Sequence, residues 1–280
     1  MATNSQIKKS KDKTFILTLT IPQSDITAEY ESHLKNIQKD FETKGFRKGK
    51  APLEVVKANV SQPNLMEDIL NHLLSHAYTD EIKNNDIKPI IEPRVKILNP
   101  PITLEKDWEV EFTGAEMPDL SLKPAYQEEI KKSSKSSPKT DTKEAQTAEL
   151  DRIFDIVLKN SSVELPEILI EAGVDNRLSQ LVDQTAQAGI SVDQYLESKK
   201  MTLEQFKDSL KDDVRKEWIL NLAINKIAAD EKLEVSQDEL KKQLETNPQL
   251  ANNINLLYYL LQQQKVVSFL TKLATETAGK

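Results

Sequence analysis

Residues 44–52 read Lys-Gly-Phe-Arg-Lys-Gly-Lys-Ala-Pro, and the rest of the chain is interpreted outward from this stretch. It holds four cations and no acid, although the chain as a whole has a formal net charge of -7. Gly45 and Gly49 flank Phe46, and glycine allows the positive φ angles that a tight loop needs. We therefore expect a basic loop with an aromatic tip, suited to phosphates or to an acidic protein surface. The cations are Lys44, Arg47, Lys48 and Lys50.

Two other interpretations of this loop were weighed. In the first, it is a solvated hairpin or interhelix turn, and Phe46 folds inward as part of the core. In the second, it cradles a nucleotide phosphate. A Walker loop has four residues between its glycines and a Ser or Thr after the lysine. Here three residues separate Gly45 from Gly49, and Ala51 follows Lys50, so we reject the nucleotide loop.

Composition limits the class of protein. Aromatic residues make up 5% of the chain and charged residues 30%, which favours long helices with much wetted surface and an extended molecule. The absence of cysteine excludes disulfides, thiolate metal sites and a cysteine nucleophile, and it fits a reducing compartment. No signal-peptide pattern and no run of eighteen apolar residues is present. We expect a cytoplasmic protein that does not cross a membrane.

The first 122 residues alternate strand and helix patterns, which predicts an α+β domain. β-Branched residues nearly alternate up to Pro22, which predicts a strand. Ser24 and Asp25 are candidate caps for the helix that follows, and Pro52 suits the first turn of another helix. The expected strands are 13–21, 94–98 and 108–115, and the expected helices are 24–40, one beginning at Pro52, and 63–84.

His72 and His76 are four residues apart on the long predicted helix and could share one side of it. No glutamate follows His72, as the zinc-protease motif requires, and no third ligand is evident from the sequence. We interpret both as structural histidines and predict neither a metal site nor any cofactor.

The segment 123–143 is the clearest break in the chain. Its central part, Lys131 to Lys139, reads Lys-Lys-Ser-Ser-Lys-Ser-Ser-Pro-Lys and has no apolar residue to bury. Such composition is typical of a flexible linker. We therefore predict a basic linker over 123–143.

Residues 144–280 show helical periodicity throughout, which predicts an all-α, extended multi-helix domain. No histidine follows His76, and no catalytic constellation is evident, so we expect no enzyme. The stretch 250–273 is more apolar than one buried helix stripe requires. Part of it, with the helix that carries Trp218, is expected to form an open cleft for unfolded chains. The candidate client-binding residues are Trp218, Leu222, Ile254, Leu257, Tyr258, Leu261 and Phe269.

The run from Gly45 to Pro52 resembles the ribosome-docking signature of the trigger factor family. Its members are bacterial chaperones that sit where the nascent chain leaves the ribosome. Further along, Leu165-Pro166-Glu167, Tyr195-Leu196 and the run Val-Ser-Gln-Asp-Glu-Leu from Val235 are similar to that family's C-terminal chaperone domain. The signature is matched at Gly45, Phe46, Arg47, Gly49, Lys50 and Pro52.

The resemblance implies an α+β ribosome-binding domain over 1–122, joined by the 123–143 linker to a helical chaperone domain over 144–280. Family members carry an FKBP-type prolyl isomerase domain near the linker, but the short 123–143 segment has no room for one. The expected function is ATP-independent shielding of apolar segments in nascent polypeptides. The expected docking site is the large subunit, both protein and ribosomal RNA, near the tunnel exit. The implied docking residues are Lys44, Gly45, Phe46, Arg47, Lys48, Gly49, Lys50 and Pro52.

The alternatives are a free cytoplasmic assembly factor or nucleic-acid-binding module that uses the basic loop, and, weakest, a prolyl isomerase. The sequence also leaves undecided whether the free protein forms a homodimer.

Overall fold

The computed structural model describes residues 4–133, 143–246, 249 and 253–275. The chain divides into two compact units, residues 1–117 and residues 118–280. No helix in the described part of the chain combines the length and the apolar character that a membrane span needs.

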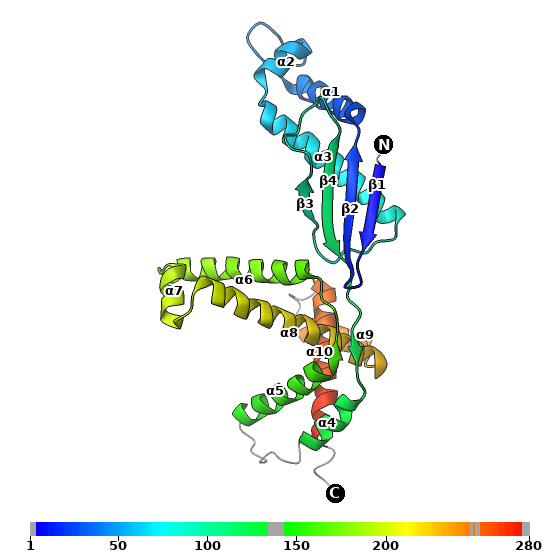
Figure 1. Cartoon of the computed structure of the whole chain (residues 1–280), viewed down its shortest axis with the longest axis vertical. Helices are drawn as coiled ribbons and strands as arrows, with labels where there is room; N and C mark the ends of the chain where they lie inside the picture. The colour runs from blue at the N-terminus through cyan, green and yellow to red at the C-terminus, as the bar shows by residue number, and fades with distance from the viewer. Residues whose placement is uncertain (1–3, 134–142, 247–248, 250–252, 276–280) are drawn as a thin grey trace. The chain divides into compact units, whose positions relative to one another are not determined.

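A four-stranded antiparallel sheet in the order β1-β2-β4-β3 forms one side of the first unit (Figure 1). Its central strands, β2 (Thr14–Ile21) and β4 (Trp108–Ala115), alternate buried and less buried residues as the sequence predicts. Leu17 lies opposite Phe112 and Leu19 opposite Val110. Because successive side chains of a strand point to opposite faces, these residues all reach one apolar face. The sheet is completed by β1 (Asn4–Lys9) and β3 (Arg94–Ile97).

Three helices accompany this sheet, and their apolar residues share one core with it. They are α1 (Gln23–Asp40), α2 (Leu53–Asn59) and α3 (Gln62–Asn84), and α1 packs on both α2 and α3. Two sequence predictions need correction here. The N-cap of α1 is Pro22, and neither Ser24 nor Asp25 caps it. The strand β1 was not predicted at all, because its residues are mostly polar and lie at the edge of the sheet.

The second unit is helical apart from a two-residue ladder between β5 (Ser121–Leu122) and β6 (Ser161–Ser162). Four of its helices bury a common apolar cluster. They are α4 (Ala125–Ser133), α5 (Lys143–Asn160), α8 (Leu203–Asp230) and α10 (Ile254–Thr275). The predicted fold class, an α+β unit followed by a helical unit, is confirmed.

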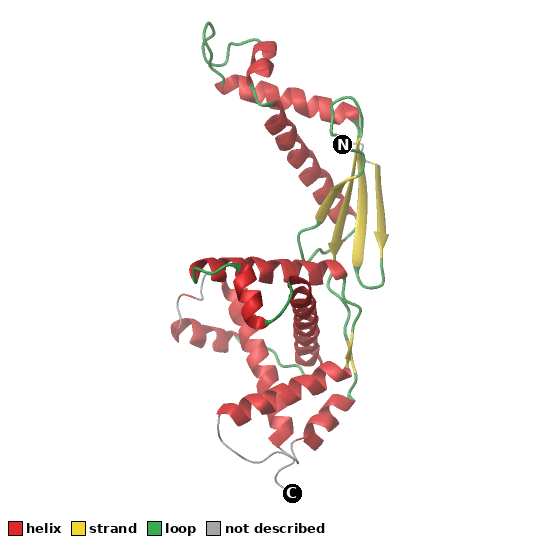
Figure 2. Ribbon diagram, turned by 60° about the vertical axis from the view of Figure 1, so that its left-hand side comes forward, coloured by secondary structure: helices red, strands yellow, loops and turns green. Residues whose placement is uncertain are grey.

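An arm extends from this cluster and consists of α6 (Glu167–Gln187), α7 (Val192–Lys199) and α8. Figures 1 and 2 show α6 and α8 side by side, with α7 at the tip. The helices approach closely where Gly173 of α6 faces Val214, since a Cβ at Gly173 would lie 2.6 Å from Val214 Cγ1. Thr202 caps α8 as predicted, through a capping box with Gln205.

The predicted linker 123–143 is wrong over much of its length. Helix α4 occupies Ala125–Ser133, and its Tyr126 and Ile130 are buried against the helical cluster. The boundary between the units therefore lies at Met117–Pro118 instead of residue 122. The prediction rested on the many lysines of this segment and overlooked Tyr126 and Ile130, two apolar residues one helical turn apart. The rest of the predicted linker, residues 134–142, lies outside the described residues.

Candidate functional site

The predicted docking residues lie in the loop between α1 and α2, called here the docking loop (residues 41–52). Two turns shape it. In the first, the Phe46 N–H donates to the Thr43 carbonyl at 3.1 Å, and Gly45 has a φ of +93°. In the second, the Lys50 N–H donates to the Arg47 carbonyl at 2.9 Å, and Gly49 has a φ of +73°. Both glycines thus hold backbone conformations that other residues rarely adopt.

The base of the docking loop is fixed to the end of α1. The Gly49 N–H donates to the Phe41 carbonyl at 3.0 Å, and a Cβ at Gly49 would lie 3.0 Å from the Lys39 carbonyl oxygen. The Gln38 side chain donates to the carbonyl of buried Ala51 at 2.6 Å. These bonds hold both ends of the loop against one helix, which lowers the entropy that a partner must remove on binding.

Phe46 and its neighbouring cations face solvent. The Phe46 side chain is 39% exposed and lies outside the core of the first unit, so the alternative in which it folds inward is wrong. Lys44, Arg47 and Lys50 are exposed and make no ion pair within the described part of the chain. The loop therefore presents an aromatic ring among positive charges that no ion pair in the described part of the chain offsets.

Lys48 differs from the other cations of the loop. Its Nζ lies 2.7 Å from Asp40 Oδ1 at the end of α1. The hydrogen bond and charge of Lys48 hold the pKa of Asp40 below its usual range. This lysine therefore already has a partner within the first unit. Pro52 also acts locally, because its carbonyl accepts the Val55 and Val56 N–H groups as the N-cap of α2.

The predicted client residues do not form one surface. Leu222 and Leu257 are buried, with 7% and 3% of each residue exposed, so a client cannot reach them in the folded unit. Trp218 is half-buried and lines a cavity of about 440 Å³. That cavity also contains the ion-paired Arg177 and Glu217, so its polar lining is a poor match for an apolar chain.

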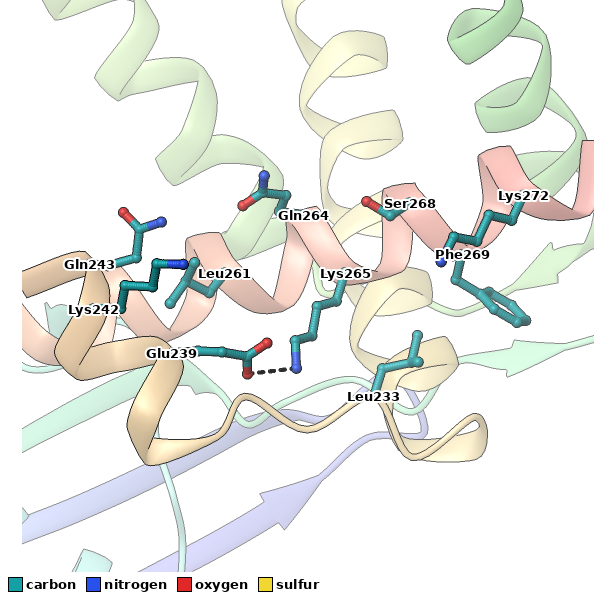
Figure 3. Close-up of a pocket in the computed structure, with 10 residues that line it drawn as sticks. All are labelled: Leu233, Glu239, Lys242, Gln243, Leu261, Gln264, Lys265, Ser268, Phe269 and Lys272. Carbon is teal, nitrogen blue, oxygen red and sulfur yellow. Dashed lines mark hydrogen bonds and ion pairs between the residues drawn. The ribbon is translucent and has the colours of Figure 1, made fainter. Parts of the chain in front are cut away.

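The other four predicted residues remain accessible to some extent, and two of them share a groove. Leu261 and Phe269 of α10, with Leu233, line a groove of about 510 Å³ against α9 (Gln237–Thr246). Figure 3 shows the Lys265 ammonium reaching Glu239 across it, at 2.7 Å. Bonds from Lys265 and from Ser236 lower the pKa of the Glu239 carboxyl to about 2. The ion pair joins α9 to α10 across the groove.

The beginning of α10 also exposes large apolar residues. Ile254 and Tyr258, both predicted, are 51% and 36% exposed. Leu256 and Leu260 are 44% and 46% exposed and were not selected from the sequence. Helical periodicity could not separate them from Leu257, because apolar residues occupy every side of this segment. Further exposed apolar residues surround the tip of the arm, namely Val182, Ile190 and Leu203.

The family described as "Bacterial trigger factor protein (TF)" matches residues 3–153, and "Bacterial trigger factor protein (TF) C-terminus" matches residues 126–277. The chain belongs to the trigger factor family. The two matched segments overlap, so no separate domain fits between the trigger factor N- and C-terminal regions of this chain.

The similarity to individual trigger factors is low in sequence identity. "Trigger factor" of Staphylococcus aureus strain JH9 is 28% identical over 156 residues, and the protein of strain Newman matches equally. The match spans 56% of this chain and 36% of the relative, so this chain aligns with only about a third of the length of these curated trigger factors. A solved structure has a TM-score of 0.62 at 12% identity and covers 95% of this chain. It comes from a study of "Promiscuous Substrate Recognition in Folding and Assembly Activities of the Trigger Factor Chaperone", and at this identity it supports the fold alone.

Proposed function

We propose that this trigger factor is an ATP-independent chaperone that docks on the ribosome and shields apolar segments of nascent chains. The observation that carries the proposal is the docking loop, in which Phe46 and Arg47 are exposed on a braced base. An aromatic ring and an arginine are the side chains that most often dominate interface energies. Ribosomal RNA and acidic protein surfaces supply the matching negative charge. The chain itself would act in the cytoplasm and without catalysis.

Co-sedimentation with purified ribosomes tests the docking step. Replacing Phe46 and Arg47 together by alanine is expected to weaken binding by about thirtyfold or more, the equivalent of one interface hot spot. The variant should also show a smaller dependence of affinity on salt, by about one unit of slope if Arg47 meets a phosphate. The matched control replaces Val95 and Lys96 by alanine, which removes one exposed apolar residue and one cation from β3. Equal binding by both variants would refute docking through this loop.

The role of Lys48 can be separated from that of Arg47. If Lys48 acts by holding the loop against Asp40, then Asp40→Asn should weaken ribosome binding as much as Lys48→Ala does. The double variant should be no worse than either single variant, because both remove the same contact. If Lys48 contacts the ribosome directly, Asp40→Asn leaves binding unchanged or strengthens it. The three dissociation constants therefore distinguish a positioning lysine from a contact lysine.

We propose the beginning of α10 and the adjoining groove as the client surface. Apolar contacts impose no hydrogen-bond pattern, so such a surface can accept many sequences. Replacing Ile254, Leu256 and Leu260 by serine should reduce the protection of a denatured client against aggregation in the absence of ATP. The control variant replaces three apolar residues of similar exposure in the first unit, Val95, Leu98 and Met117. Protection that falls equally in both variants, or in neither, would contradict this assignment.

A further inference from the structure

The chain contains three histidines, and the fold brings all of them together. His33 lies on α1, and His72 and His76 lie one turn apart on α3. The ring centroids of His33 and His72 are 5.7 Å apart, and those of His72 and His76 are 4.6 Å apart. The sequence showed only the pair on α3, because the third histidine comes from a helix that is distant in the chain.

One carboxylate oxygen lies between two of these rings. Glu29 Oε1 is 3.0 Å from His33 Nδ1 and 2.9 Å from His72 Nδ1. His33 Nδ1 is shielded from solvent and makes no hydrogen bond within the described residues, even though the carboxylate is so near. The nitrogen and the oxygen are thus close without being aligned as donor and acceptor. A buried nitrogen that makes no hydrogen bond is unusual in a native protein and calls for an explanation.

A metal ion would give these three side chains a common partner. Zinc lies about 2.0–2.2 Å from histidine nitrogen and carboxylate oxygen in a tetrahedral site, so neighbouring ligand atoms are about 3.3 Å apart. The two observed distances are shorter than that spacing by about 0.3–0.4 Å, so the side chains must move slightly apart to admit an ion. Imidazole and carboxylate are ligands that suit Zn²⁺, Ni²⁺ and Cu²⁺.

We propose that Glu29, His33 and His72 bind a divalent transition-metal ion of the Zn²⁺ type, with His76 available as a further ligand. As the side chains stand in the described part of the chain, no three His, Cys, Asp or Glu residues are placed so that they could hold a metal ion. Binding therefore requires the imidazoles to rotate, and the exposed side chain of His72, at 46%, leaves room for this and for entry of the ion. Glu29 and His33 are less exposed, at 18% and 24%, so the site has a sheltered side and an open side.

The ion would link α1 to α3. These helices pack on each other, and the docking loop begins where α1 ends. Metal binding is therefore expected to stabilise the first unit, since an ion that binds the folded state alone shifts the unfolding equilibrium by mass action. The site lies outside the docking loop, and its existence does not depend on the proposed ribosome interaction.

The test uses the full chain without a histidine tag. Zn²⁺ is titrated while the imidazole proton NMR resonances are recorded, and because the chain has three histidines, each resonance can be assigned with single His→Gln variants. We expect the His33 and His72 resonances to shift and saturate at one equivalent of Zn²⁺, and Mg²⁺ to leave them unchanged. The absence of any shift, or a shift confined to His72 and His76, would overturn the proposal.

Affinity measured by calorimetry gives a second, independent result. His33→Gln, His72→Gln and Glu29→Gln should each weaken Zn²⁺ binding by about tenfold or more, and each should abolish the rise in Tm that Zn²⁺ causes in the unaltered chain. Ser75→Ala, an exposed change between the two histidines of α3, should leave the affinity unchanged. Wild-type affinity in His33→Gln would show that the ion binds the surface pair on α3 alone, which contradicts the proposal. Circular dichroism confirms that each variant is folded.

Discussion

Gly114 is expected to be one of the positions in the first unit most sensitive to a single added methyl group. It lies on β4 directly opposite Phe15 of β2, and the Phe15 ring is fully buried above it. A Cβ at Gly114 would lie 2.4 Å from Phe15 Cζ and 2.8 Å from Cε1. Ordinary carbon contacts are about 3.5–4.0 Å, so the ring would have to move by about 1 Å into a core that has no room for it.

The size of the effect follows from two opposing contributions. Overpacking a core typically costs about 1–3 kcal/mol, and the short contact with a fully buried ring places Gly114→Ala in the upper part of that range. Alanine is favoured over glycine inside a strand by about 0.5–1 kcal/mol. The free energy of unfolding of the first unit should therefore fall by about 1–2.5 kcal/mol.

A second substitution tests the cause. Phe15→Leu removes the part of the ring that meets the new methyl group and by itself leaves a void over Gly114. In the double variant the methyl group fills part of that void. The double variant should thus be more stable than the sum of the single effects predicts, with a coupling of about 1 kcal/mol or more. Thr113→Ala, the neighbouring position on the other face of β4, serves as the control.

The two tryptophans allow the measurement to be confined to one unit. Trp108 is fully buried in the first unit, whereas Trp218 belongs to the second. In a Trp218→Phe background, urea unfolding followed by fluorescence reports on the environment of Trp108 alone. An unchanged or higher stability of Gly114→Ala, or strict additivity in the double variant, would refute the packing argument.

Three further predictions concern other parts of the chain. Ile130→Ala should lower the stability of the second unit by about 2–5 kcal/mol, measured through Trp218, because Ile130 is fully buried; a surface linker would give no change. Glu239 has a pKa of about 2 against an ordinary 4.5, so its contribution to stability is complete above pH 4.5 and is lost as the pH falls toward 2. Amide exchange in α9 should accelerate over that pH interval, and Glu239→Gln should remove this pH dependence. If the unaltered chain and Glu239→Gln have the same dependence of exchange rate on pH, the ion pair is not its cause. Gly49→Ala should strain the docking loop by about 1–2 kcal/mol and weaken ribosome co-sedimentation, and full binding would show that the loop tolerates the change.

Periodicity predicted the elements that bury one clear apolar face. The strand β2 and the helices α1 and α3 were expected within a residue or so of their observed bounds, because their buried residues recur at the spacing of a strand or a helix. The strand β1 gave no such signal. It forms an edge of the sheet, and its polar, lysine-rich sequence is typical of edge strands that resist pairing with other molecules.

The candidate sites likewise include some features that local sequence predicts and others that depend on tertiary structure. The docking loop could be located from the sequence, because its glycines and cations are local features. The pairing of Lys48, which distinguishes it from Arg47, could not be predicted, since it depends on the position of Asp40 at the end of α1. Leu257 and Tyr258 are neighbours in the sequence, yet one is buried and the other exposed. Tertiary packing decides which side of α10 is buried, and the apolar pattern of the sequence alone does not indicate it.

The position of α4 explains how the helical unit of this trigger factor is complete without an inserted domain. Helix α4 packs on α5 and on α10, and β5 pairs with β6, so the chain on both sides of residues 134–142 is fixed to the same cluster. Insertions are best tolerated where the folded core does not depend on the chain that joins its elements. A domain could be gained or lost at residues 134–142 without changing the buried residues of α4, α5, α8 or α10.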